Sequence, residues 1–149
     1  MERLKKHLVI SFSGKTRNSG DMQKSVWSRY SNGDPEVISG LHKIRGAARV
    51  MAQGLQQDRR DMVVASLNEV CEGVDLIDDA IHDPFRDVVQ PLIDSGSAVA
   101  WKALGAGGGG CSAILCSSTG REEVIQAIEG AKWEIIDWDF EDKGVLIHD

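Results

Sequence analysis

The sequence lacks an excess of positive charge and any long apolar run. Its 149 residues carry 17 Lys and Arg against 23 Asp and Glu, which gives a formal net charge of −6. Because binding to a nucleic-acid backbone requires clustered Lys and Arg, this balance argues against a nucleic-acid-binding protein. No apolar stretch approaches the roughly 20 residues that cross a bilayer, and residues 1–7 lack the apolar core of a secretory signal. We therefore expect a cytoplasmic protein with neither nucleic-acid nor membrane partners.

Cysteine and histidine are also scarce, and their spacing excludes two common kinds of site. Cys71, Cys111 and Cys116 are an odd number without a CxxC pair, so neither a disulfide framework nor a four-ligand zinc site is encoded. The four histidines show no metal-ligand spacing such as HExxH. The nucleophile elbow GxSxG and a local Ser/His/Asp set are absent as well. We assign no metal ligand and no catalytic residue, and we expect Cys111 and Cys116, which lie in an apolar run, to be buried, inert thiols.

What is present predicts one domain over residues 1–149. A hydrophobic content of 42% with 27% charged residues is ordinary for a globular chain of this length. Apolar periodicity predicts strands at 8–12, 98–104, 111–116 and 132–140, with an edge strand at 143–147. It predicts helices at 21–31, 34–55, 58–81, 85–95 and 119–130. This order is the ferredoxin-like split βαβ arrangement, an α+β two-layer domain with extra helices in the first crossover.

Helix signals support these boundaries. Asp34 with Pro35 suits a helix start, Asp58 is a cap candidate for the next helix, and Thr119 with Glu122 forms a capping box. The apolar stripe of the 58–81 helix takes steps of four and three without error: Val63, Leu67, Val70, Val74, Ile77 and Ile81. We expect this helix to pack antiparallel on the preceding one.

The glycine run at residues 105–110 is the most informative feature. Five of its six residues are glycine, and it lies between two apolar strands. A tight turn needs only one or two glycines, whereas a loop without side chains lets successive N–H groups approach an anionic group. The match to GxGxxG is weak, because a strand rather than a helix follows the last glycine.

A second polar loop follows the first strand. Gly14, Lys15 and Thr16 imitate the end of a P-loop, but Val9 stands where its first glycine belongs. The loop either cradles a hydroxyl-rich or phosphorylated ligand or is simply solvated. Carboxylate clusters such as Asp75, Asp78 and Asp79 are expected on solvated faces, and the four Trp in the core or at interfaces. Trp101 is the exception to follow, because it stands four residues before the glycine run.

Three segments resemble one family. Residues 102–111, KALGAGGGGC, closely resemble the third motif of the GHMP small-molecule kinases, a lysine followed by GAGGGG. Residues 12–20, FSGKTRNSG, and residues 138–145, WDFEDKGV, are similar to the TGxxRxSG and FxFxxxG stretches of the D-glycero-D-manno-heptose 7-phosphate kinase branch. All three occur in the family's order and at its spacing.

The resemblance implies a fold and an activity. The C-terminal domain of that family is ferredoxin-like with inserted helices, and the family transfers the γ-phosphoryl group of Mg-ATP to a sugar, a sugar phosphate or a similar alcohol. ATP and Mg would be the cofactors. The phosphate, nucleotide or substrate loop would consist of Gly105, Ala106, Gly107, Gly108, Gly109 and Gly110. Further ligand contacts would come from Lys102, Arg17, Asn18 and Ser19.

The chain also departs from the family. The N-terminal ATP-binding lobe, with its PxxxGLGSS loop and catalytic acid, is absent, so no Mg site is expected in this chain. Cys71, Val74 and Asp75 stand where the branch commonly has Trp and basic residues, and Trp101 replaces a small residue. The lost positive charge would weaken charge-assisted binding of a phosphorylated acceptor.

Three functions therefore remain open. The preferred one is the C-terminal half of a sugar kinase that pairs with an N-terminal lobe, which predicts an exposed apolar docking face. The second is a free-standing anion- or nucleotide-binding module. The third is a remnant that only forms homo-oligomers, with Trp101 lying over the glycine loop.

Overall fold

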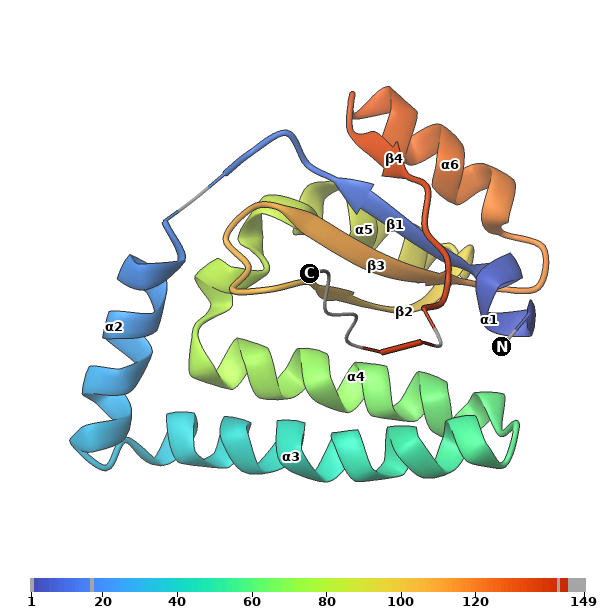
Figure 1. The fold of residues 1–149 in the computed structure, drawn as a ribbon. Coiled ribbons are helices and arrows are strands. Elements are labelled where there is room, and N and C mark those ends of the chain that lie inside the picture. Colours follow the sequence, from blue (N-terminus) through green and yellow to red (C-terminus); the bar gives the residue numbers. More distant parts are fainter. Residues whose placement is uncertain (1, 17, 142, 145–149) are drawn as a thin grey trace, which may run out of the picture.

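A four-stranded antiparallel sheet with helices packed around it forms the centre of the molecule (Figure 1). The structure is a computed structural model that describes residues 2–16, 18–141 and 143–144. The strands are β1 (Leu8–Phe12), β2 (Ala98–Ala103), β3 (Cys111–Cys116) and β4 (Glu134–Ile136). The helices are α1 (Glu2–His7), α2 (Ser19–Ser31), α3 (Pro35–Gln56), α4 (Arg60–Ile77), the 3₁₀ turn η1 (Asp79–Ile81), α5 (Asp83–Asp94) and α6 (Arg121–Gly130).

The strand order is β2-β3-β1-β4, and every neighbouring pair is antiparallel. The first strand thus lies inside the sheet between two strands that come much later in the chain. This is the split βαβ arrangement, so the predicted α+β class with helices inserted in the first crossover is confirmed. The register pairs Phe12 with Cys111 at one end and Leu8 with Leu115 at the other.

The main core lies between one face of the sheet and helices α5 and α6. Because side chains alternate across a strand, Trp101 of β2 and Ile114 of β3 point to this face together. On α5, positions 85, 89 and 92 recur at helical spacing and are buried. The buried cluster is completed from both helices: Phe85, Val89, Leu92, Val124 and Ile128.

Helices α3 and α4 form a hairpin whose inner helix, α4, packs against β2 and the opposite side of the sheet (Figure 1). Val63 and Leu67 of α4 meet Ala100 and Leu115 there. The two helices approach closely where Gly40 faces Gly73, and a Cβ on either glycine would overlap the backbone carbonyl of the other. The prediction of an antiparallel pair is confirmed.

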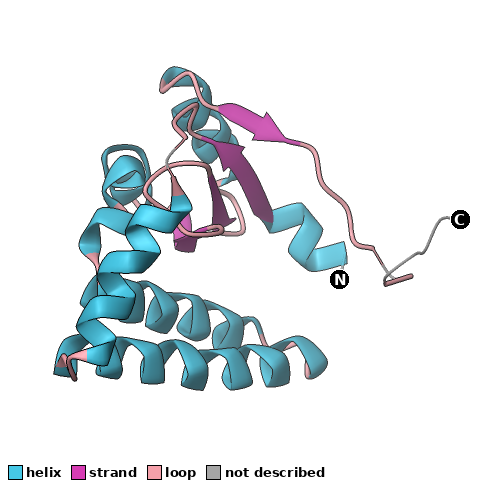
Figure 2. Cartoon of the chain, turned by 60° about the vertical axis from the view of Figure 1, so that its left-hand side comes forward, coloured by secondary structure: helices cyan, strands magenta, loops and turns pink. Residues whose placement is uncertain are grey.

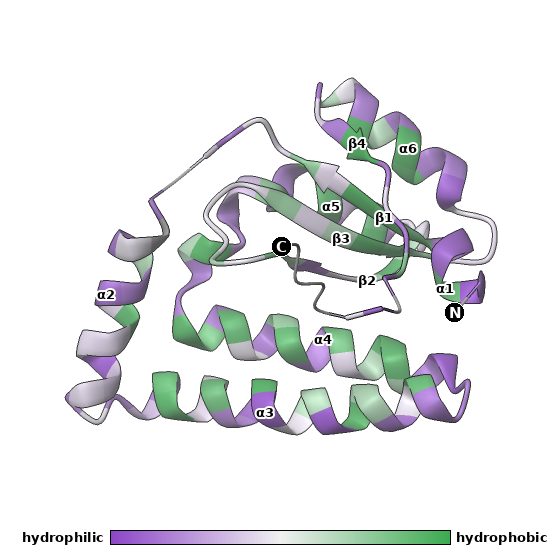
Figure 3. Cartoon of the chain, in the orientation of Figure 1, coloured by the Kyte–Doolittle hydropathy of each residue, from purple (hydrophilic) through white to green (hydrophobic). Residues whose placement is uncertain are grey.

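Helix α2 stands apart from this body. Its last turn joins α3 through a short turn, and Arg29 anchors it by donating to Asp34 Oδ2 (2.7 Å) and to the carbonyl of Ile77 (2.6 Å). None of its residues whose burial the structure describes is fully buried. Figure 2 shows α2 rising from one end of the hairpin, and Figure 3 shows it mostly hydrophilic or neutral.

Two of the predicted helix caps are wrong. The helix predicted over 58–81 begins at Arg60 and ends at Ile77; Asp58 does not cap it, because its backbone is left-handed (φ 51°) and its carboxylate pairs with Arg3. Thr119 does not cap α6 either, because Gly120 is the cap residue. A side chain at Gly120 would overlap the backbone of Ser97, so this position requires glycine.

The C-terminal strands were also overestimated. The strand predicted over 132–140 is limited to Glu134–Ile136, which pairs with β1, and the chain then leaves the sheet. Lys5 of α1 forms an ion pair with Asp139, which draws this segment toward α1. Residues 143 and 144 are not strand, and 145–147 lie outside the described residues. Helix α1 was not predicted at all.

Candidate functional site: the glycine loop

The glycine loop, residues 105–110, joins β2 to β3 at one end of the sheet. The N–H of Leu104 donates to the carbonyl of Cys111 (2.8 Å) and closes the base of the loop. All five glycines have positive φ, between 69° and 143°. Residues with a side chain rarely adopt this backbone conformation, so the path of the loop requires glycine at each of these positions.

The second half of the loop is locked against two other segments. The N–H of Gly108 donates to the carbonyl of Ile81 (2.8 Å), and the N–H of Gly110 donates to that of Lys15 (2.7 Å). Gly108 and Gly109 are buried, and a Cβ on Gly109 would lie 2.8 Å from the Lys15 carbonyl oxygen. These hydrogen bonds hold the glycine loop beside both η1 and the polar loop that follows β1.

The first half is more open, although a Cβ on Gly107 would overlap the Ile81 side chain. Gly105 is exposed and Gly107 is partly exposed. Within the described residues, the N–H groups of Gly105, Ala106 and Gly107 have no hydrogen-bond partner. An anion-binding nest requires left-handed backbone within a short run of residues, and the positive φ of Gly105 and Gly107 meets this requirement. This half of the loop can therefore bind an anionic group, whereas the locked half cannot offer the amides of Gly108 and Gly110.

A buried histidine lies next to Ile81, the residue that holds the loop. His82 follows Ile81 directly and is only 1% exposed. Its Nδ1 lies 2.8 Å from Asp75 Oδ1, which also accepts from Arg86 Nη2 (2.6 Å), and its ring lies 4.5 Å from the Trp101 ring. Burial lowers the pKa of His82, against the raising effect of Asp75. The neutral ring fits this site, since its Nε2 is buried without a partner in the described part of the chain.

Two further groups lie near the start of the loop. Lys102 Nζ donates to the carbonyl of Ala103 (2.8 Å), and burial lowers the pKa of this lysine. Among the described residues it forms no ion pair. The thiol of Cys71 donates to the carbonyl of Trp101 (2.7 Å), and burial raises its pKa to about 12. Lys102 is thus a cation without a carboxylate, and Cys71 is an inert thiol.

The other residues expected at the site divide into three groups. Asn18 caps α2, because its Oδ1 accepts from the N–H of Gly20 (3.0 Å). Arg17 and the side chain of Ser19 lie outside the described residues. Trp101 packs in the core against Phe85 and His82, as expected of most Trp side chains.

Sequence reasoning missed the polar contacts of His82 and Asp75 beside the loop. Asp75 was expected on a solvated face; it is 37% exposed, yet it binds both His82 and Arg86. His82 was counted only among four histidines without metal-ligand spacing. The one local signal was the His-Asp-Pro sequence at 82–84, which marks the break but not the buried ring.

Comparison with solved structures decides the kind of fold. A Listeria innocua protein, Lin0012, matches with a TM-score of 0.73 at 13% identity over 87% of this chain and 38% of that one. The Methanococcus jannaschii mevalonate kinase matches with a TM-score of 0.57 at 18% identity, over 91% and 40% of the two chains. The L. major mevalonate kinase, solved with R-mevalonate, matches with a TM-score of 0.53 at 16% identity, over 83% and 38%.

The chain has the fold of a GHMP kinase C-terminal domain. It spans about 40% of the length of the solved chains that it matches. No family model matches the sequence, and no curated protein matches it either. These likenesses concern the GHMP-like fold and leave the heptose kinase branch a prediction.

The donor set fits a phosphate better than a metal. Open N–H groups and the cation of Lys102 suit a phosphate oxygen, whereas Mg²⁺ takes oxygen ligands such as carboxylates. In the parts of the chain that the structure describes, no group of three or more His, Cys, Asp or Glu side chains is placed to hold a metal ion.

None of the described helices is both long and apolar enough to cross a membrane.

Proposed function

We propose that the chain is the C-terminal half of an ATP-dependent sugar or sugar-phosphate kinase of the GHMP type. In this proposal it contributes the glycine loop, while the catalytic acid and the Mg²⁺ ligands belong to an N-terminal lobe. The observation that carries the proposal is the more open half of the loop, where three successive N–H groups have no partner among the described residues, on a GHMP-like fold. The heptose-phosphate acceptor rests only on the resemblance of residues 12–20 and 138–145.

The chemistry assigned to this chain is binding and positioning. ATP with Mg²⁺ would supply the phosphoryl group when bound. The N–H groups of residues 105–107 would hold phosphate oxygens at fixed positions, and Lys102 would add positive charge to the start of the loop. Phosphoryl transfer depends on such positioning and charge stabilisation more than on covalent chemistry by the protein.

Helix α2 supports the proposal of a partner. Trp27 and Tyr30 are 62% and 45% exposed, and their rings lie edge to face with centroids 6.0 Å apart. Exposed aromatic side chains are enriched where proteins dock, because they bury large apolar area on association. The proposed partner is an N-terminal kinase lobe, and a second copy of this chain is the alternative.

The test is an NMR titration of the ¹⁵N-labelled chain with Mg-ATP, Mg-ADP and a heptose phosphate. NMR detects dissociation constants in the millimolar range, so a half-site that binds weakly is still seen. We expect the amide signals of residues 105–107 to shift in a saturable way with a phosphorylated ligand. Adenosine without phosphate is the matched control ligand and should leave these signals unchanged.

Two outcomes would contradict the proposal. One is that the amide signals of the loop stay unchanged at about 10 mM of every phosphorylated ligand, since a dissociation constant of that size corresponds to a binding free energy of only about −3 kcal/mol. The other is a shift produced equally by adenosine. Saturable binding well below about 1 mM would instead favour the alternative, a stand-alone nucleotide-binding module that works without its lobe.

A further inference from the structure

A pocket lies at the opposite end of the sheet from the glycine loop. It has a volume of about 330 Å³ and is lined from α1, the α3–α4 turn, the start of α4 and the end of β3. Strand β3 begins at Cys111, beside the loop, and reaches Leu115 in this pocket, where it pairs with Leu8. The two sites are therefore separated by the length of the strand, and this pocket has no part in the function proposed above.

The floor of the pocket is apolar. Leu115 and Val63 are buried, and Leu4 packs beside them in the same cluster. Leu55, at the end of α3, lines the pocket and is 51% exposed. A bound apolar chain would cover Leu55 and extend the cluster. This binding is favourable because it removes apolar surface from water.

Basic side chains surround this floor, although the chain as a whole is acidic. Arg3 pairs with Asp58 at 3.0 Å, and Arg59 pairs with Asp61 through two hydrogen bonds. Arg60 differs: its Nη2 donates to the carbonyl of Cys116 (2.7 Å), and it forms no ion pair with any described carboxylate. In the described part of the chain, its remaining donors have no negative partner.

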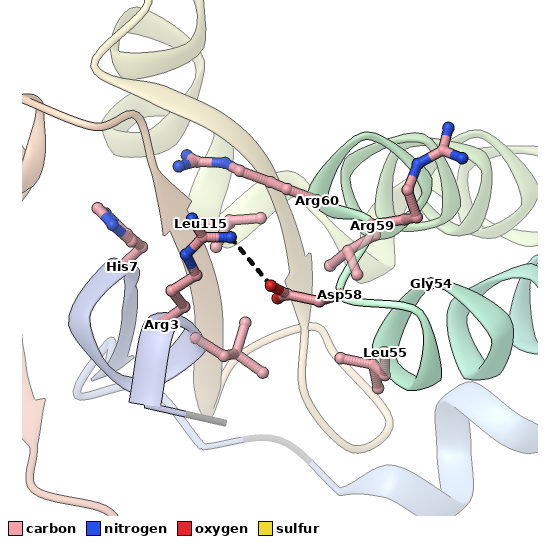
Figure 4. A pocket seen from close by; sticks show the side chains of 10 residues that line it. Arg3, His7, Gly54, Leu55, Asp58, Arg59, Arg60 and Leu115 are labelled. Atoms are coloured by element: carbon pink, nitrogen blue, oxygen red, sulfur yellow. Dashed lines mark hydrogen bonds and ion pairs between the residues drawn. The ribbon is translucent and has the colours of Figure 1, made fainter.

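The close view shows how these groups are arranged. In Figure 4, Arg60 reaches over Leu115 toward the side of the pocket where Arg3 and His7 of α1 lie. Leu55 lies on the other side, at the end of α3. Asp58 points between them and binds Arg3. A ligand could therefore place an anionic group near Arg60 and an apolar chain toward Leu55.

We propose that this pocket binds a small amphipathic anion, a phosphate monoester or a carboxylate on a short apolar chain. Arg60 holds the anionic group, because a guanidinium presents paired donors that match carboxylate and phosphate oxygens. The leucines of the floor hold the chain, in keeping with ligand pockets that are mostly apolar with a few placed polar groups. The carboxylate of Asp58 would compete with the bound anion for the basic side chains, since it already forms an ion pair with Arg3.

The first experiment is calorimetric titration of the purified chain with octyl phosphate, octanoate and octanol. We expect saturable binding of at least one of the two anions, and binding of octanol weaker by about tenfold or more, the effect of a lost charge-assisted hydrogen bond. Octyl phosphate alone would identify a phosphate monoester, and octanoate alone a fatty acid. Binding of both would support the shared chemistry.

Matched variants then locate the site. Arg60→Gln should weaken binding about tenfold, whereas Arg49→Gln, an exposed arginine on α3 outside the pocket, should leave it unchanged. Leu55→Ser should weaken binding severalfold, whereas Val50→Ser, also exposed on α3, should not. Thermal melts verify that each variant is folded.

A third variant predicts a gain. Asp58→Asn removes the competing carboxylate, and asparagine tolerates the left-handed backbone at this position (φ 51°). Binding of the anion should become about twofold to fivefold tighter, in line with the small energy of an exposed ion pair. A purely structural role of Asp58 would not produce this gain.

Three results would overturn the proposal. They are no saturable binding of either anion, equal binding of octanol, or equal effects of Arg60→Gln and Arg49→Gln. Binding of octyl phosphate that shifts the amides of residues 105–107 but not those of Leu4 and Leu55 would also overturn it, while supporting the function of the glycine loop.

Discussion

The close packing of Gly107 on Ile81 leads to a quantitative prediction. A methyl group at Gly107 would overlap the Ile81 side chain and lie 2.8 Å from its carbonyl oxygen, whereas a methyl group at Gly105 would meet no atom within 4 Å. Both positions have a φ of 70°, so Gly107→Ala and Gly105→Ala carry the same backbone strain, about 1–2 kcal/mol. Overpacking adds about 1–3 kcal/mol at Gly107 only.

The assay is urea unfolding followed by tryptophan fluorescence, since Trp101 packs beside His82 next to this contact. Gly105→Ala should lower the free energy of unfolding by about 1–2 kcal/mol, and Gly107→Ala by about 2–5 kcal/mol. With a slope of about 2 kcal/mol/M, the two midpoints should differ by roughly 0.5–1.5 M. Equal midpoints would refute the claim that Gly107 packs closely on Ile81.

Three further predictions concern the surroundings of the loop and the hairpin. Burial holds the pKa of His82 below its usual 6.5, so the unfolded chain binds a proton on this ring more readily than the folded chain does. The free energy of unfolding should therefore fall as the pH drops below about 6.5. In urea titrations, His82→Gln should lose this part of the pH dependence. The thiol of Cys71, with its pKa raised to about 12, should be alkylated by iodoacetamide at neutral pH only after unfolding, as mass spectrometry would show; rapid labelling of the native chain would contradict its burial. Gly73→Ala should destabilise the helix hairpin by about 1–3 kcal/mol, whereas Gly46→Ala, in open space on α3, should stabilise it by about 0.5–1 kcal/mol, and thermal melts that give the same sign for both would argue against the close crossing.

Local patterns predicted the elements whose boundaries depend on nearby residues. Asp34 accepts from the N–H of Glu36 (3.0 Å), so the start of α3 is a local capping event. Strands β1 and β3 have the predicted bounds because each is a short, uninterrupted apolar run. The glycine run was also found locally, since its composition alone demands an explanation.

Sequence patterns failed where a backbone break or a contact between residues far apart in the sequence determines the structure. The apolar stripe continues to Ile81, but the backbone breaks at Asp78, whose side chain accepts from the N–H of Ala80 and starts η1. Periodicity does not register this break, because the 3₁₀ turn still places Ile81 against the core. Likewise, the support of the loop joins residues far apart in the sequence, and no local pattern encodes the pairing of His82 with Asp75 or of Gly110 with Lys15.

The most direct test of the account measures hydrogen exchange at the loop amides by NMR, with and without Mg-ADP. The account predicts slow exchange at Gly108 and Gly110, whose N–H groups donate to Ile81 and Lys15. It predicts faster exchange at Gly105 and Gly107 and a marked slowing there when the phosphorylated ligand binds. Uniformly fast exchange through the loop, or open amides that Mg-ADP leaves unchanged at saturating concentration, would contradict the claim that the loop is a locked support with one open anion-binding half.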